Sequence, residues 1–188
     1  MADVDPVAAA FAAHPREGFL PEKVRSRAAY DGPLDIGHGQ TNSQPRTVEA
    51  MLRLLDVRPG DRVLDVGAGS GWTTALLAHL TGPGGRVVGL ELEPDLVVFG
   101  SGNLARTDQP WASLEQATPG RLGDPDRAPY DRILVSAEAR TTPRALVDQL
   151  ADGGRMVVPV AGELLLVVRE GEQVVETGHG GYRFVPLR

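Results

Sequence analysis

The sequence of 188 residues contains no cysteine, and only 5% of its residues are aromatic. The lack of cysteine excludes a disulfide framework, a thiolate nucleophile and the cysteine-based zinc motifs. Histidine is also sparse, and the four histidines have no spacing typical of metal ligands: His14, His38, His79 and His179. We therefore expect no structural metal.

The sequence also lacks an apolar run of membrane-spanning length, and its acidic first residues lack the apolar core of a secretory signal. Nineteen basic side chains are outnumbered by 25 acidic ones, so the formal net charge is −6. This balance argues against nonspecific binding to nucleic acid. We expect a single-domain cytoplasmic monomer over residues 1–188, with neither membrane nor nucleic acid as a partner.

Glycine, in contrast, is frequent, and three glycines alternate in Val-Leu-Asp-Val-Gly-Ala-Gly-Ser-Gly-Trp, residues 63–72. An apolar run gives way to these glycines and then to a helical pattern, which predicts a strand, a tight turn and a helix. Glycine allows the sharp turn and a close approach to a ligand, and free N–H groups at a helix start suit an anionic group. The pattern predicts a nucleotide-binding unit whose turn contains Gly67, Ala68, Gly69, Ser70 and Gly71. The simpler alternative is a turn that only lets the strand and the helix pack.

The spacing of these glycines is G-x-G-x-G, whereas a dinucleotide site prefers G-x-G-x-x-G. Asp65, directly before the turn, is more typical of a site for a cationic cofactor. A second apolar strand over residues 86–91 ends in Glu91, twenty residues after Gly71. Because this kind of fold places an acid at about that distance on ribose hydroxyls, Glu91 is the expected ribose ligand.

The remaining pattern alternates helices and strands. We expect helices over residues 6–13 (capped by Asp5), 22–29, 47–55, 73–80 and 143–150. We expect strands over residues 130–136 and 153–160, then a hairpin of residues 164–168 and 173–176 with a closing segment at 182–187. Glycines and a proline between residues 95 and 116 predict a short or distorted helix there. The sequence thus predicts an α/β fold with a mostly parallel central sheet, helices on both faces and an antiparallel C-terminal hairpin.

Residues 36–45, Ile-Gly-His-Gly-Gln-Thr-Asn-Ser-Gln-Pro, have no apolar periodicity. Their many polar groups need partners that a packed core would not offer, so we expect a functional loop. A solvated linker is the alternative.

Several stretches together resemble one family, the protein-L-isoaspartate O-methyltransferases, which use S-adenosylmethionine. The stretches occur in the family's order: Gly37-His-Gly-Gln-Thr-Asn-Ser-Gln-Pro45, Pro59-Gly-Asp-Arg-Val-Leu-Asp-Val-Gly-Ala-Gly-Ser-Gly71, Pro129-Tyr-Asp131, Gln149-Leu-Ala-Asp-Gly-Gly-Arg155, Val158-Pro-Val160 and Phe184-Val-Pro-Leu187. The glycine unit is common to many methyltransferases, whereas the loop at 37–45 is close to a signature of this family. The resemblance implies a Rossmann-like class I methyltransferase fold, with residues 1–45 as a helical and substrate-loop extension and residues 46–188 as the cofactor-binding core.

The resemblance also implies roles for individual residues. Asp65 and the glycine turn would hold the amino-acid end of S-adenosylmethionine, Glu91 the ribose, and Gly120 would contribute to the cofactor site. Ser43, with Thr41 and His38 nearby in sequence, would face the substrate carboxylate as the catalytic set.

Methylation of a carboxylate needs no general base, because an acid with a pKa of about 4 is already an anion at neutral pH. The protein must align the reacting atoms and exclude water. Ser43 is thus expected to position the substrate rather than attack it. A serine hydrolase is disfavoured because no G-x-S-x-G elbow surrounds Ser43.

The chain departs from the family pattern where the family usually has Gly-Asp-Gly, with its acid near the adenine. The sequence here is Thr118-Pro-Gly120, and Pro119 offers neither a carboxylate nor an N–H. Glu115 or Asp124 are possible substitutes for that acid. Residues 99–114 also lack the family's long helix and the apolar strand that normally leads into this turn, so we expect that strand to be absent or displaced. Trp72 stands where the family often has tyrosine and could still pack beside the cofactor.

The sequence therefore predicts methyl transfer from S-adenosylmethionine to a carboxylate in a peptide or protein, with L-isoaspartyl residues as the expected substrate. Such a reaction starts repair through a succinimide. Two alternatives stay open: a family member that has lost catalysis and acts as a binding protein, and a methyltransferase with another carboxylate or small-molecule acceptor. Nucleic-acid methylation has no support, since no Asn-Pro-Pro-aromatic motif is present.

Overall fold

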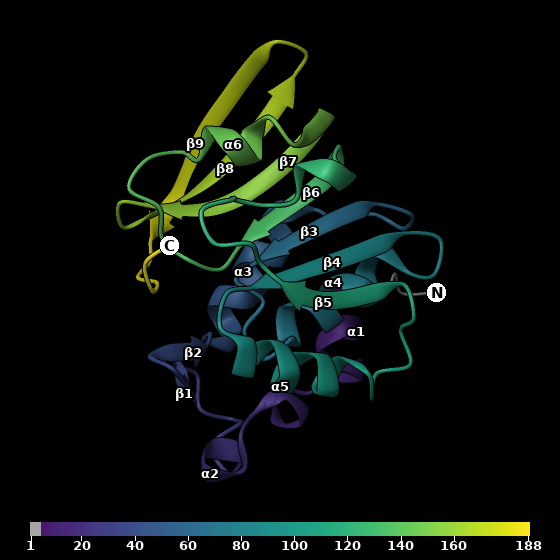
Figure 1. Cartoon of the computed structure of the whole chain (residues 1–188), viewed down its shortest axis with the longest axis vertical. Helices are drawn as coiled ribbons and strands as arrows, with labels where there is room; N and C mark the ends of the chain where they lie inside the picture. The colour runs from purple at the N-terminus through teal and green to yellow at the C-terminus, as the bar shows by residue number, and fades with distance from the viewer. Residues whose placement is uncertain (1–4) are drawn as a thin grey trace.

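The computed structural model describes residues 5–188 and is built around a seven-stranded sheet of the order β5-β4-β3-β6-β7-β8-β9 (Figure 1). The first five strands in this order run parallel: β5 (Ala112–Gln116), β4 (Arg86–Glu91), β3 (Arg62–Val66), β6 (Tyr130–Val135) and β7 (Leu150–Val160). The antiparallel hairpin of β8 (Glu163–Glu170) and β9 (Gln173–Gly181) completes it. The predicted mixed sheet is confirmed.

Within the described residues the chain forms six α-helices: α1 (Pro6–Ala13), α2 (Glu22–Arg25), α3 (Pro45–Leu55), α4 (Trp72–Thr81), α5 (Pro94–Leu104) and α6 (Arg144–Val147). Short 3-10 turns, η1 (Arg16–Phe19) and η2 (Pro125–Arg127), lie beside them. Asp5 caps α1 as predicted, since its carboxylate accepts from the N–H groups of Val7 and Ala8.

Two helices are shorter than the sequence predicts. The segment expected as a helix over residues 22–29 is α-helical only in α2. After α2 the chain forms turns in which an N–H donates to the carbonyl three residues earlier. The segment expected over residues 143–150 ends early, because Leu150 already pairs with Tyr130 at the start of β7. Strand pairing competes there with the helical pattern.

The two faces of the sheet carry separate apolar cores, as the two-residue period of a strand requires. Val63 and Leu64 are adjacent in β3, yet Val63 packs with α1, α3 and α4, whereas Leu64 packs with α6 on the other face. Val87 and Val88 of β4 divide in the same way. Helices therefore cover both faces, with only the short α6 and a loop on the second.

The stretch expected as a distorted helix is instead continuous, and the strand expected to be absent or displaced is present as β5, parallel to β4. The glycine at position 100 is explained by contacts with residues outside α5. A Cβ at Gly100 would lie 2.7 Å from the carbonyl oxygen of Gly69 and 2.6 Å from Leu114 Cδ1. The glycine lets α5 lie against the backbone of the glycine turn.

The polar stretch at 36–45 overlaps two short strands that sequence analysis missed, β1 (Leu34–Gly37) and β2 (Gln40–Asn42). They form a separate hairpin near α2, at the end of the molecule opposite the β8–β9 hairpin (Figure 1). The tip has positive φ at Gly37, His38 and Gly39. In β1 the buried Leu34 and Ile36 alternate with the exposed Asp35, but two apolar residues are too short a signal for a strand, and β2 contains no apolar residue.

Gly100→Ala should lower the melting temperature, since it forces a side chain against Gly69 and Leu114, a change worth about 1–3 kcal/mol of unfolding free energy. Gly102→Ala is the matched control on the same helix, because no atom lies within 4 Å of its added Cβ. It should stabilise the protein by about 0.5–1 kcal/mol. Thermal denaturation of both variants checks this, and equal effects would contradict the packing role of Gly100.

Candidate active site

A crevice opens at the carboxyl edge of the sheet, where β3 is flanked by β4 on one side and β6 on the other. This is the position where open parallel sheets bind ligands. Including its open mouth, the crevice has a volume of about 920 Å³. Several parts of the chain line it: the glycine turn after β3, strand β2 with Ser43, the end of β4 at residues 90–92, residues 117–123, residues 136–137 after β6, and the C-terminal residues 185–188.

The glycine turn forms the floor of the crevice. The N–H groups of Gly67 and Ala68 both donate to the carbonyl of Leu90, at 2.9 and 3.0 Å, which joins the end of β3 to the end of β4. Gly67, Ala68, Gly69 and Ser70 line the crevice. Gly71 does not line it. It precedes α4, with φ 82°, and its added Cβ would lie 2.8 Å from the carbonyl oxygen of Gly100.

Glu91, at the end of β4, lines the crevice and is almost fully buried. Its Oε2 accepts from the N–H of Gly69 at 2.9 Å, and its Oε1 accepts from Leu92 and Glu93 at 2.7 and 3.0 Å. The carboxylate thus fixes the glycine turn and the next loop at once. A carboxylate oxygen can accept two hydrogen bonds, so Oε2 keeps a free position.

Asp65 lies behind the crevice rather than on its surface, since it is completely buried and does not line it. Its Oδ2 accepts from the hydroxyls of Thr73 and Thr74, each at 2.7 Å, and Thr73 does line the crevice. Among the described residues, no group donates to Asp65 Oδ1. Burial raises the pKa of Asp65 to about 6. A buried carboxylate behind the glycine turn, with one oxygen unpaired, fits a cationic cofactor.

Strand β2 and Ser43, directly after it, supply the opposite side of the crevice. Thr41 and Ser43 line it, together with Gln40 and Asn42. His38 does not line it. It lies at the tip of the β1–β2 hairpin, with its Nε2 3.2 Å from a carboxylate oxygen of Asp95. Nearness in sequence did not bring His38 to Ser43.

Asn42 was missed by sequence analysis. Its side chain is buried, and its Nδ2 donates to Ser70 Oγ at 3.0 Å, so it joins the loop to the glycine turn. Arg16, also missed, is buried and donates to Asn42 Oδ1 at 2.6 Å. The sequence pattern does not distinguish Asn42 from the polar residues beside it.

Two further segments, which sequence analysis did not assign to the site, complete the wall of the crevice. Ser136 and Ala137 follow β6, and their contribution could have been inferred from the position of β6 beside β3. The C-terminal segment is bound to the same connection through the backbone of Glu138: its N–H donates to Val185 O at 2.7 Å, and its carbonyl accepts from the N–H of Leu187 at 2.8 Å. The C-terminal family motif thus lies in the site.

Residues 117–123 form the wall where the family's acid is missing. Thr118, Arg121 and Leu122 line the crevice, whereas Pro119 and Gly120 do not. Gln149 fixes this segment from behind: its amide donates to Leu122 O at 2.9 Å and accepts from the N–H of Asp124 at 2.8 Å.

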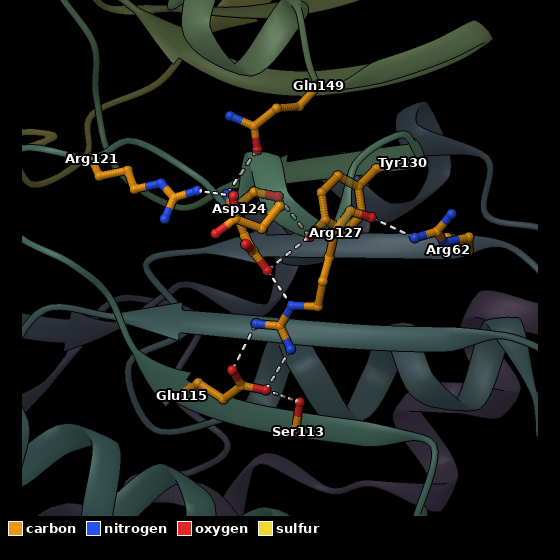
Figure 2. Close-up of polar contacts among 9 residues, drawn as sticks. Arg62, Ser113, Glu115, Arg121, Asp124, Arg127, Tyr130 and Gln149 are labelled. Carbon is orange, nitrogen blue, oxygen red and sulfur yellow. Dashed lines mark hydrogen bonds and ion pairs between the residues drawn. The ribbon is translucent and has the colours of Figure 1, made fainter.

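Neither Glu115 nor Asp124 replaces the missing acid, because both bind Arg127 (Figure 2). Neither of them lines the crevice. Arg127 forms a two-pronged pair with Glu115, at 2.9 and 2.7 Å, and its Nε pairs with Asp124. Tyr130 also donates to Asp124 (Figure 2). This cluster anchors the loop from its outer side and provides no acid to a ligand.

No helix within residues 5–188 is long and apolar enough to cross a membrane. In the same part of the chain, no three or more His, Cys, Asp or Glu side chains are grouped as metal ligands.

Asp65 should make the protein less stable as the pH rises. Its pKa is raised from 3.8 to about 6 by folding, so the folded state holds the proton more tightly, and the stability this contributes is lost as the pH rises through about 6. Between about pH 5 and pH 7.5 the loss is about 1 kcal/mol. Asp65→Asn should remove this part of the pH dependence of the melting temperature, and the exposed Asp148→Asn should keep it. An unchanged profile in Asp65→Asn would contradict the assignment.

Comparisons with known proteins identify one family. A family model described as protein-L-isoaspartate(D-aspartate) O-methyltransferase matches residues 1–188. A protein-L-isoaspartate O-methyltransferase of Methanopyrus kandleri is 46% identical over 186 residues, which cover 96% of this chain and 82% of that protein. One of Methanocella arvoryzae is 46% identical over 178 residues, covering 92% and 93%.

A solved structure of a protein-L-isoaspartate O-methyltransferase from Plasmodium falciparum, in complex with S-adenosyl-L-homocysteine, has a TM-score of 0.86 and 26% identity. The alignment covers 100% of this chain and 92% of that one. The class I methyltransferase fold and the family that the sequence motifs predict are thus confirmed. The chain belongs to the protein-L-isoaspartate O-methyltransferase family.

Proposed function

We propose that this chain transfers the methyl group of S-adenosylmethionine to the free carboxylate of an L-isoaspartyl residue in a peptide or protein. The observation that carries the proposal is one crevice shared by the glycine turn and the loop with Thr41 and Ser43. A site for a donor and a site for an acceptor are therefore side by side.

The residues of the crevice suit this cofactor. The glycine turn would hold its amino-acid end, with Asp65 acting from behind the turn through Thr73, and Glu91 would accept from ribose hydroxyls through its free lone pair. The apolar side chains of Leu90 and Leu122, with the backbone of residues 117–123, would hold the adenine ring. When bound, S-adenosylmethionine supplies a methyl group on a positively charged sulfur.

The acceptor side needs only to orient an anion. Thr41 and Ser43 carry hydroxyl donors into the crevice, which suit a carboxylate. A carboxylic acid with a pKa of about 4 is ionised at neutral pH, so no proton must be removed. The position of His38 outside the crevice agrees with a reaction that lacks a general base. Apolar groups such as Ile36 and Leu187 limit the access of water.

The proposal includes a cytoplasmic monomer whose partners are peptides and proteins and not nucleic acid. The excess of 25 acidic over 19 basic side chains supports the last part.

A direct test compares an isoaspartyl peptide with its normal aspartyl twin, each incubated with radiolabelled S-adenosylmethionine. Base-labile methyl ester should form on the isoaspartyl peptide at a kcat/KM at least about 10²-fold above its twin, a range that polar recognition can provide. Cofactor binding without ester on either peptide would support a binding protein instead. Ester on an unrelated small carboxylate alone would support another acceptor.

Ser43→Ala and Glu91→Gln should affect different steps. Ser43→Ala removes one neutral hydrogen-bond donor and should lower kcat/KM for the peptide by about tenfold, with the Kd of S-adenosylhomocysteine unchanged. Glu91→Gln removes a charged acceptor from three backbone N–H groups and should raise that Kd by about 10- to 100-fold. Calorimetry and initial rates separate the two effects. Loss of cofactor binding in Ser43→Ala would refute this division.

A further inference from the structure

Arg16 is a buried cation directly behind Asn42 and Ser43, the end of β2 and the start of the next loop, which we call the acceptor loop. It begins the turn η1, is 5% exposed, and does not line the crevice. Within residues 5–188 no carboxylate forms an ion pair with its guanidinium, and the charge of Asp31 acts on it only from a greater distance. A buried charge without a paired anion is costly, so its presence calls for compensating contacts.

Neutral oxygens supply those contacts. One terminal nitrogen of Arg16 donates to Tyr30 O at 2.8 Å. The other lies 2.8 Å from Gly32 O, 2.9 Å from Asn42 O and 2.9 Å from Ser43 O, while Nε donates to Asn42 Oδ1 at 2.6 Å. The rigid fork of the guanidinium therefore holds both residues at the end of β2 through backbone and side chain.

Hydrogen bonds also connect Asn42 to the glycine turn at the floor of the crevice. The Asn42 amide donates to Ser70 Oγ at 3.0 Å, and Asn103 of α5 donates to Ser70 O at 2.9 Å. The guanidinium carbon of Arg16 also lies 5.7 Å from the ring centroid of Trp72, which lines the crevice. Arg16 thus ties the acceptor loop to the turn that holds the donor.

The charge of Arg16 persists at neutral pH. Burial lowers the pKa of this guanidinium to about 10, which is still well above neutrality. In a water-poor environment such a charge attracts an anion more strongly than it would at the surface. An anion bound beside Ser43 would lie on the crevice side of the backbone that the guanidinium holds.

We propose that Arg16 is a positioning residue of the acceptor subsite, which holds Asn42 and Ser43 in place for the substrate carboxylate and favours that anion by its positive charge. The inference rests on the proposed function and adds to it a residue outside the crevice.

Arg16→Lys tests the fork while it keeps the charge. In the full chain this variant should raise the KM for the isoaspartyl peptide and lower kcat/KM by about 10²-fold, as displacement of a substrate-orienting group can. The Kd of S-adenosylhomocysteine should change less than about threefold, a shift under 1 kcal/mol. Arg25→Lys, on the neighbouring exposed helix α2, is the matched control and should keep wild-type kinetics.

A double variant separates positioning from general stability. If Arg16 acts through Ser43, the losses from Arg16→Lys and Ser43→Ala should not add, because the two groups share one subsite. Asn42→Ala is a second route to the same result should Arg16→Lys fail to fold. It removes the link between Arg16 and Ser70 but leaves four backbone acceptors around the guanidinium.

The outcomes are distinct. Wild-type peptide kinetics in folded Arg16→Lys, additive losses with Ser43→Ala, or weakened cofactor binding equal to the loss of activity would each overturn the role of Arg16. If Arg16→Lys does not fold, unchanged peptide kinetics in Asn42→Ala would overturn it. A wild-type protein that methylates no isoaspartyl peptide would instead refute the proposed function, and this inference would fall with it.

Discussion

The site depends on the Glu91 carboxylate, which binds three backbone N–H groups at the carboxyl edge of the sheet. One of these belongs to the glycine turn after β3 and two belong to the loop after β4, so a single side chain sets the distance between two strand ends. Helix α5 lies against the backbone of this glycine turn, and only a residue without a Cβ at position 100 allows that contact. Sheet, turn and helix are thus fitted to one another around one buried acid.

Two buried charges of opposite sign flank the crevice. Asp65 lies behind the glycine turn, where a positively charged donor would bind, and Arg16 lies behind the loop that would receive a carboxylate. Neither side chain lines the crevice. Each acts through a neighbour that does, Thr73 in one case and Asn42 with Ser43 in the other. This arrangement suits a transfer between a cation and an anion without exposing either protein charge to water.

The sequence predicted those features that follow from local pattern. Apolar runs gave the strands, and alternating glycines gave the turn with Glu91 at the proper distance. It failed where the reason for a residue lies elsewhere in the chain. From its sequence neighbours alone, Gly100 predicts an interrupted helix, but in the structure it allows contact between α5 and Gly69. His38 belongs to the sequence motif but lies on a hairpin tip whose backbone directs it to Asp95. Arg16 became visible only through carbonyl partners as far as 27 residues away.

A crystal structure with both S-adenosylhomocysteine and an isoaspartyl peptide bound would show whether one crevice holds donor and acceptor in two adjacent halves. We expect ribose hydroxyls at Glu91 and the peptide carboxylate beside Ser43, with Arg16 still bound to the loop behind it. A peptide carboxylate bound away from the loop after β2, or a nucleoside that does not touch the end of β4, would contradict this expectation.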